Sequence, residues 1–106
     1  MSYRFMRLLL FFDLPVETAS QQKEYRHFVK SLEKEGFMRL QYSVYCKLTV
    51  TQSLGFAVKK RIKSFLPKKG YVMILMVTEK QYSEMDFLLG EKSDEFLNDD
   101  HNLVFL

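Results

Sequence analysis

One carboxylate, Asp13, stands where it could do chemistry. It directly follows the apolar residues 8–12, so we expect its side chain at the end of a buried strand, where active groups are often held rigidly. One carboxylate makes a poor Mg²⁺ site, because this ion takes octahedral oxygen ligands from carboxylates, waters and phosphates. Two copies of Asp13 across a twofold axis would hold the ion better and could activate water against a phosphodiester. Alternatively, Asp13 only caps the turn after the strand.

Basic residues gather between positions 59 and 69. Such a run could be a solvated helix face and turn, or a surface that follows the phosphates of a nucleic acid. Phe56 lies one helical turn from several of these lysines, and an aromatic side chain on a polar face indicates that DNA or a protein covers it. The predicted nucleic-acid-binding residues are Lys59, Lys60, Lys63, Lys68 and Lys69.

The other reactive residue types form no pattern typical of a site. The chain has no Gly-x-Ser-x-Gly, Walker or Gly-x-Gly-x-x-Gly motif, and four glycines are too few for a glycine-rich phosphate cradle. His27 and His101 have no partner at metal-ligand spacing, so both are expected at the surface. Cys46, the one cysteine, cannot form an internal disulfide or complete a closed zinc site, which fits a reducing compartment.

Length and composition indicate one folded domain. The chain has 106 residues, of which 47% are apolar and 15% aromatic. A domain of this size has a small core, so we expect dimerisation to support it. The sequence has no apolar stretch long enough to span a membrane and no signal-peptide pattern, so we expect a cytoplasmic protein.

Charge divides the chain into two parts. Residues 1–85 carry fifteen Lys or Arg against seven Asp or Glu, a net charge of +8, whereas residues 86–106 carry one against six, a net charge of −5. The basic body suits a polyanion, and the acidic tail could shield it or dock elsewhere. We therefore expect a folded domain over residues 1–85 and a tail over 86–106 whose apolar segments, 86–89 and 102–106, form edge strands with a partner chain.

Periodicity predicts the elements that position Asp13. Residues 4–13 form an apolar run too short for an independent helix, typical of a buried central strand, and Pro15 stops it. Thr18 and Gln21 have capping-box spacing, and apolar residues at positions 25, 28, 29 and 32 predict an amphipathic helix over 19–35. Gly36 supplies the left-handed stop of that helix.

The second half of the chain repeats this order. Residues 37–49 alternate with a period of two, with the apolar set at 40, 42, 44, 46 and 48, which predicts one long strand or two strands joined near Tyr42 and Ser43. Thr49 and Gln52 suggest a second capping box before a helix over about 51–66, and residues 71–78 indicate another buried strand. With one bend in 37–49 the order is βαββαβ, the ferredoxin-like plait of the α+β class.

Three segments carry a resemblance to a known family. They are Arg7-Leu-Leu-Leu-Phe-Phe-Asp-Leu-Pro15, the Lys23-Glu-Tyr-Arg-x-Phe28 of the first helix and Gly36-Phe-x-x-Leu-Gln-Tyr-Ser-Val-Tyr45. In order and spacing, over nearly the whole chain, they look like CRISPR-associated protein 2, the small subunit of the spacer-acquisition complex. The Phe-Asp-Leu-Pro and Gln-Tyr-Ser-Val-Tyr pair is most similar to members from type II-A systems.

The resemblance implies more than the residues show by themselves. It implies a ferredoxin-like protomer, and with it the bent or hairpin form of residues 37–49, and a homodimer formed through the sheets. It implies that Asp13 is the metal-binding and catalytic residue of a Mg²⁺-dependent endonuclease acting on single-stranded RNA or double-stranded DNA. In the acquisition complex, the family's dimer bridges two dimers of the integrase subunit and holds the duplex spacer precursor.

Three functions are therefore alternatives. We favour a CRISPR adaptation protein that holds DNA as an adaptor and has a conditional nuclease activity. The second is a metal-dependent nuclease as the main role, and the third is a ferredoxin-like regulatory module with a small-molecule pocket at the dimer interface. For the first, we expect the tail to add as a strand to the other protomer or to the integrase subunit, through Leu103, Val104, Phe105 and Leu106.

Overall fold

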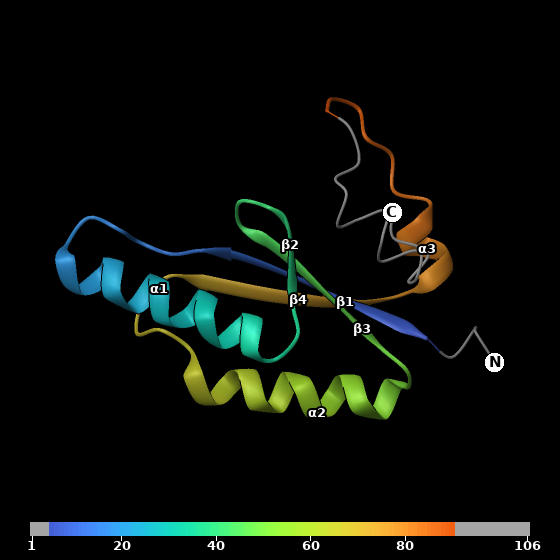
Figure 1. Ribbon diagram of the computed structural model, residues 1–106, viewed down its shortest axis with the longest axis horizontal. Coiled ribbons are helices and arrows are strands. Elements are labelled where there is room, and N and C mark those ends of the chain that lie inside the picture. The colour runs from blue at the N-terminus through green and yellow to red at the C-terminus, as the bar shows by residue number, and fades with distance from the viewer. Residues whose placement is uncertain (1–4, 91–106) are drawn as a thin grey trace.

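The computed structural model describes residues 5–90, which form one sheet with two long helices on the same face (Figure 1). In chain order the elements are β1 (Met6–Asp13), α1 (Ala19–Lys34), β2 (Met38–Gln41), β3 (Val44–Thr49), α2 (Gln52–Ile62), a 3₁₀ helix (Lys63–Phe65), β4 (Tyr71–Thr78) and α3 (Glu79–Ser83). The strands lie in the order β2-β3-β1-β4, and every neighbouring pair is antiparallel. This is a ferredoxin-like plait, so the predicted α+β fold class is confirmed.

The apolar strand β1 lies in the middle of the sheet, as predicted. It pairs with β4 along its whole length, from Met6 opposite Thr78 to Asp13 opposite Tyr71, and with β3 on its other side. Strands β2 and β3 form a hairpin in which only Tyr42 and Ser43 connect the two strands. The periodicity of residues 37–49 was compatible with one long strand or with two strands joined by a bend, and the structure shows two strands.

The helix α1 begins and ends on the signals predicted for it. The Thr18 Oγ1 accepts a hydrogen bond from the Gln21 N–H at 3.0 Å, and the Gln21 Oε1 accepts one from the Thr18 N–H at 3.1 Å. At the other end, Gly36 has φ +96°, and the N–H of Phe37 bonds back to the carbonyl of Leu32 at 3.0 Å. Together with the bond from the Gly36 N–H to the Glu33 carbonyl, this is a Schellman C-cap.

The predicted N-cap of the second helix was wrong by two residues. Thr51, rather than Thr49, caps α2, with its Oγ1 accepting a hydrogen bond from the Leu54 N–H at 3.1 Å. Thr49 is unavailable because β3 continues through it, and its hydroxyl donates to the Met6 carbonyl at 3.4 Å. Within residues 5–90, no helix is long and apolar enough to cross a bilayer.

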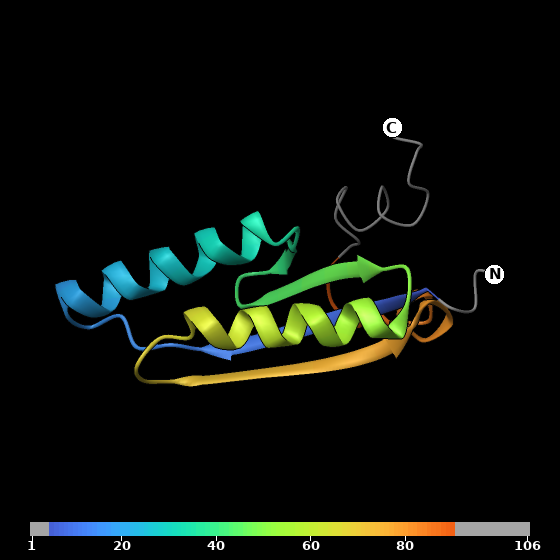
Figure 2. The same cartoon turned by 90° about the horizontal axis from the view of Figure 1, so that it is seen from below.

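The main core lies between the sheet and the two long helices. Seen from below in Figure 2, α2 lies in front of the strands and α1 lies alongside it. Even-numbered residues of β1 project toward them, and the Phe12 ring meets the Phe28 ring edge-on at 5.5 Å. The buried members of this core are Leu8, Leu10, Phe12, Leu14, Phe28, Leu32, Phe37, Tyr45, Val58 and Ile62. Full burial of each large apolar side chain stabilises the fold by about 2 kcal/mol.

The opposite face of the sheet carries neither of the two long helices and is here called the helix-free face; only part of it is covered. The short helix α3, which the sequence did not predict, lies there against β1 and β4 (Figure 1). Its Tyr82 packs with Leu9 and Cys46 in a second, smaller cluster, to which Phe87 contributes. Residues 86–89, one of the two segments predicted to form edge strands, form no strand within residues 5–90. Residues 91–106, with the partner-binding residues predicted in the tail, lie outside the described residues.

Strand β4 is an edge strand, so the prediction that it is buried was wrong for one of its faces. On the helix-free face, Tyr71, Met73 and Leu75 are 74%, 65% and 54% exposed. The reason is that β4 borders the sheet, and α3 reaches only the end where Val77 lies. Its other face, turned toward α2, is partly buried.

Candidate nucleic-acid and metal site

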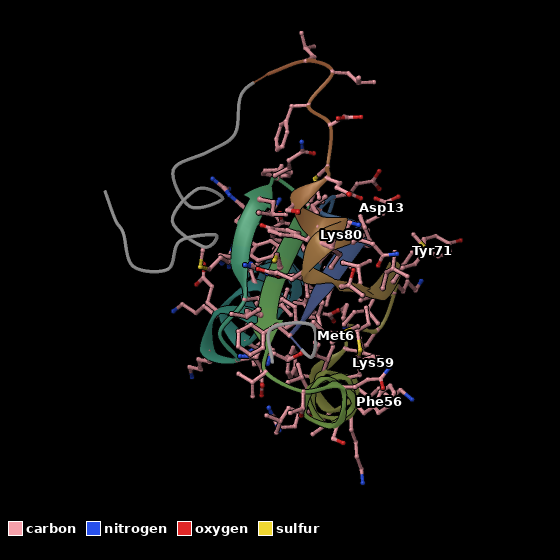
Figure 3. The ribbon with its side chains drawn as sticks, turned by 90° about the vertical axis from the view of Figure 1, so that its right-hand side faces the viewer. Met6, Asp13, Phe56, Lys59, Tyr71 and Lys80 are labelled. Atoms are coloured by element: carbon pink, nitrogen blue, oxygen red, sulfur yellow. The ribbon has the colours of Figure 1, made fainter. Side chains whose placement is uncertain are left out.

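Asp13 ends β1 at a corner of the sheet. Its side chain is exposed on the helix-free face and lies directly opposite Tyr71 of β4 (Figure 3). The turn before Tyr71 passes very close, since a Cβ on Gly70 would meet the Asp13 carbonyl oxygen at 2.7 Å, and Gly70 has φ +112°. Both facts require glycine at this position. The strand and this turn therefore hold the Asp13 backbone rigidly and leave its carboxylate in the open.

One protomer offers a metal ion a single carboxylate at this corner. In the part of the chain that the structure describes, no group of three or more His, Cys, Asp or Glu side chains comes together. Mg²⁺ is commonly bound by one or two carboxylates, with waters and phosphate oxygens completing the octahedron. The exposed Asp13 carboxylate could therefore supply one of the protein ligands of such an ion.

The five predicted nucleic-acid-binding lysines fall into two groups that line different hollows. Lys59, Lys60 and Lys63 lie on α2 and the 3₁₀ helix, and Lys59 and Lys63 border an apolar pocket of about 160 Å³ under α2 at the β4 edge. Lys68 and Lys69 lie in the loop just before Gly70, at the Asp13 corner. The structure thus brings only two of the five lysines to the candidate metal ligand.

Phe56, the aromatic residue among the α2 lysines, has a partner within the chain. The Lys59 Nζ lies 4.8 Å from the centre of its ring, a cation–π contact that contributes about 0.5–1 kcal/mol at an exposed site (Figure 3). The ring is still 54% exposed, so it remains available to a partner. The neighbouring Arg61 points elsewhere, because it forms an ion pair with Glu35 at 2.9 Å that joins α2 to the end of α1.

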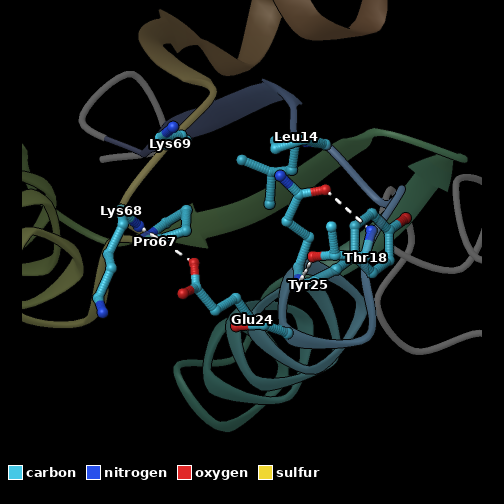
Figure 4. A pocket seen from close by; sticks show the side chains of 10 residues that line it. Leu14, Thr18, Glu24, Tyr25, Pro67, Lys68 and Lys69 are labelled. Carbon is cyan, nitrogen blue, oxygen red and sulfur yellow. Dashed lines mark hydrogen bonds between the residues drawn. The ribbon is translucent and has the colours of Figure 1, made fainter.

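A cleft of about 220 Å³ opens beside Lys68 and Lys69, between α1 and the loop that leads into β4 (Figure 4). We call it the Glu24 cleft. Its lining residues are Leu14, Pro15, Thr18, Ser20, Gln21, Glu24, Tyr25, Pro67, Lys68 and Lys69. The Lys68 N–H donates a hydrogen bond to the Glu24 Oε1 at 3.2 Å, which links the two sides. This cleft could not be predicted from the sequence, because Glu24 resembles any acidic residue on the polar side of a helix.

Tyr25 forms one wall of the Glu24 cleft and belongs to an aromatic stack. Its ring stacks on that of Tyr42 at 6.3 Å and meets Phe12 edge-on at 5.7 Å. Burial raises the pKa of Tyr25 to about 12, helped by a hydrogen bond with Tyr42 and by the charge of Tyr45. Burial also raises the pKa of Tyr45. The phenol in the cleft wall is therefore neutral at physiological pH.

A buried ion pair fixes α3 on the helix-free face. The guanidinium of Arg7, a residue with no exposed surface, donates to the Glu79 carboxylate at 2.7 and 2.8 Å, and to the Cys46 Sγ at 3.6 Å. It also lies 4.2 Å from the centre of the Tyr82 ring. Burial lowers the pKa of Arg7, but the hydrogen bonds with Glu79 and Cys46 outweigh burial and raise it above its ordinary value. An arginine inside an apolar strand was the signal for this cluster, since a buried charge needs a counter-charge.

Comparison with known proteins gives consistent matches over the described fold. The family model described as CRISPR associated protein Cas2 matches residues 6–85, from β1 through α3. A Ligilactobacillus salivarius (strain UCC118) protein named CRISPR-associated endoribonuclease Cas2 is 50% identical over 101 residues, which cover 95% of this chain and 100% of that protein. A Streptococcus mutans (strain UA159) protein of the same name is 46% identical, covering 95% of this chain and 93% of its own. The crystal structure of Streptococcus pyogenes Cas2 at pH 6.5 superposes with a TM-score of 0.57 at 26% identity, covering 79% of this chain and 99% of that one.

Proposed function

Since this chain belongs to the CRISPR-associated Cas2 family, we propose that it acts in CRISPR adaptation as a homodimer that holds duplex spacer-precursor DNA between two dimers of the integrase subunit. The observation that supports the dimer is the uncovered part of the helix-free face. Tyr71, Met73 and Leu75 project there side by side and are more than half exposed. A row of large apolar side chains on so small a domain favours burial against a second copy.

Asp13 lies on the same face, so the proposed dimer would also determine how the Asp13 carboxylates could hold a metal ion. It lies opposite Tyr71, so a twofold interface over the exposed row would bring the carboxylates of both protomers to one interface. The Asp13 of each protomer would hold Mg²⁺, and the ion when bound would neutralise the phosphodiester and make a bound water more acidic. Within the chain, the Gly70 turn holds the Asp13 backbone in place, and Lys68 and Lys69 are positioned to bind neighbouring phosphates.

A magnesium-dependent endonuclease activity, on single-stranded RNA or double-stranded DNA, is the second function that we propose for the same dimer. Two observations favour it: the exposed carboxylate on a rigid strand end, and the name endoribonuclease that the similar proteins carry. The adaptor role has priority because, within residues 5–90, no second acidic side chain joins Asp13 in a metal-binding group. The small-molecule regulatory alternative is not proposed, since membership in the family favours a nucleic-acid function.

Sequence-independent DNA holding requires contacts to phosphates rather than to bases. The basic body offers charge in two lysine groups, one on α2 and one at the Asp13 corner. Phosphate contacts position a duplex but carry no sequence information, which suits a protein that accepts almost any spacer. The two groups, repeated by the twofold axis, would give the dimer four basic areas.

The decisive experiment combines spacer acquisition in cells with assays of purified protein in Mg²⁺ and in EDTA. We expect Asp13→Asn to lose magnesium-dependent cleavage and to keep acquisition, whereas Glu17→Gln, a nearby exposed carboxylate in the β1–α1 loop, keeps both. Undiminished cleavage by Asp13→Asn would assign the activity to another site or to a contaminant. Wild-type acquisition by a variant shown to be monomeric would refute the dimeric bridge.

A further inference from the structure

The Glu24 cleft has the size and walls of a site for one flat ring. Its volume of about 220 Å³ is below the roughly 300–1,000 Å³ of sites for drug-sized ligands, so it admits a single ring system rather than a whole nucleotide. Leu14, Pro15, Tyr25 and Pro67 supply apolar surface, and all four are at least partly buried. Figure 4 shows Leu14, Tyr25 and Pro67 around the opening, with Lys68 and Lys69 on the loop side.

Two polar side chains in the cleft are held in fixed orientations. The Glu24 carboxylate accepts the Lys68 N–H at 3.2 Å, and because a carboxylate has about four acceptor positions, it can accept further donors. The Gln21 Oε1 accepts the N–H groups of Glu17 and Thr18 at 2.9 and 3.1 Å, which leaves its amide NH₂ to donate. The cleft therefore presents an acceptor and a donor whose orientations are set by the protein itself.

An acceptor beside a donor matches one class of nucleobase edge. Guanine, thymine and uracil carry a ring N–H next to a carbonyl oxygen, whereas adenine and cytosine have an acceptor nitrogen at the corresponding position. Unpaired bases are commonly recognised through hydrogen bonds to this edge and apolar contact with the ring. We propose that the Glu24 cleft binds one unpaired keto base, with its ring N–H donating to Glu24 and its carbonyl accepting from Gln21.

The position of the cleft connects this base to the candidate metal ligand. Leu14, which lines the cleft, directly follows Asp13, and Lys69 directly precedes Gly70, where a Cβ would meet the Asp13 carbonyl oxygen at 2.7 Å. Because the cleft lies on the helix side of the sheet and the Asp13 carboxylate on the other side, a strand with its base in the cleft would pass Lys68 and Lys69 at the end of the sheet before it reached Asp13. This inference rests on the proposed function, since it requires nucleic acid at this corner, and it adds the class of base and the need for that base to be unpaired.

A competition assay with the full chain in EDTA tests the proposal without cleavage. A fluorescent duplex with one unpaired guanine is displaced by unlabelled duplexes that carry an unpaired G, T, A or C at that position, or none. We expect the G and T competitors to bind about tenfold more tightly than A and C, as one hydrogen bond to a charged group suggests. Equal competition by all four would overturn the proposal.

The variant Glu24→Gln is designed to abolish the preference. Its amide oxygen can still accept the Lys68 N–H, but its NH₂ then meets the ring N–H of a keto base, donor against donor, so the preference for G and T over A and C should be lost. The matched control is Glu33→Gln, the same charge change on the same helix at an exposed position outside the cleft, which should keep the wild-type order. The same order of bases in both variants would overturn the proposal.

A second measurement separates this proposal from the proposed function. If no duplex binds the wild-type chain, DNA holding is wrong, and the cleft is then tested by titrating guanosine and adenosine monophosphates, followed by amide shifts in NMR spectra. We expect the guanosine nucleotide to shift Gln21, Glu24 and Lys69 more strongly than the adenosine nucleotide does. Equal shifts, or none, would show that the cleft does not bind a keto base.

Discussion

Arg7 of the central strand and Glu79 of α3 form an ion pair with two parallel hydrogen bonds, at 2.7 and 2.8 Å, that joins positions 72 residues apart. Arg7 lies near the start of β1, whereas Asp13 is its last residue. The pair therefore fixes α3 over one end of the helix-free face and leaves the Asp13 end open. This contact thus determines which part of the sheet stays exposed.

We predict that Glu79→Gln destabilises the protein by about 3 kcal/mol, because it leaves the buried Arg7 charge without its counter-charge. Urea unfolding monitored by circular dichroism measures this loss. The control, Glu35→Gln, breaks the Arg61 ion pair, in which Arg61 is largely exposed, and should lower the unfolding midpoint much less. Equal midpoints for the two variants would show that the Arg7–Glu79 pair contributes no more than a surface pair.

The pH dependence of stability should reveal the raised pKa of Tyr25. The folded chain keeps this proton up to about pH 12, whereas the unfolded chain loses it near pH 10.0. The contribution of Tyr25 is therefore fully present below pH 10.0 and is lost as the pH rises toward 12. We expect the free energy of unfolding to fall less steeply across this range in Tyr25→Phe. Identical slopes in both proteins would contradict the assignment.

The exposed row on β4 should control dimerisation. We expect Met73→Glu to convert the protein from a dimer to a monomer in light scattering at micromolar concentration, because two charges would meet in an apolar interface. Leu54→Glu is the control, since Leu54 is 50% exposed but lies on α2, away from the helix-free face. A melting temperature independent of concentration in the wild type would rule out the dimer.

The two lysine groups should contribute separately to the salt dependence of DNA binding. Each phosphate contact adds about 0.9 to the slope of log K against log salt, so reversing Lys59, Lys60 and Lys63 should flatten the slope for any duplex sequence. Reversing Lys68 and Lys69 should flatten it too and should also reduce cleavage, because these residues lie at the Asp13 corner. An unchanged slope after either set of reversals would show that the group concerned faces away from DNA.

Deletion of residues 98–106 tests the role predicted for the tail. We expect the truncated chain to remain folded but to lose dimer stability, integrase binding or both, as strand addition by Leu103–Leu106 requires. Sedimentation and pull-down with the integrase subunit measure these losses. Full dimerisation, integrase binding and acquisition by the truncated chain would remove any such role.

Local signals predicted those parts of the fold that local chemistry determines. The end of β1 at Asp13, the capping box of Thr18 and Gln21 and the glycine stop at Gly36 are all set by residues close together in the chain. The prediction that Thr49 caps α2 failed because the Thr49 hydroxyl donates to the carbonyl of Met6 in the sheet. In the same way, α3 depends on a strand far away in sequence, and its five residues are too few for periodicity to show.

The candidate site likewise combines residues that one segment of sequence reveals with residues that only the fold brings together. Asp13 could be found because an acid after an apolar run is visible within one segment. The Glu24 cleft could not, because Glu24 and Lys68 are 44 positions apart and meet only when α1 packs beside the loop before β4. The sequence also did not reveal which side of each strand faces the helices. Tyr45 alternates with the apolar residues Val44 and Cys46, yet it is Tyr45 that packs in the main core beneath the helices.

The central place of β1 has a consequence for how the chain acquires its structure during synthesis. The first strand made needs β4, the last, as a partner along its entire length, so its pairing spans the greatest separation in the described fold. Strands that pair across so many residues form slowly, and apolar strands that are still unpaired are prone to aggregate. A nascent chain that ends at Pro67 would carry β1 with one edge unmatched. The ribosome must therefore release Thr78 before the sheet can close, which makes the whole plait, rather than either half, the smallest unit expected to fold.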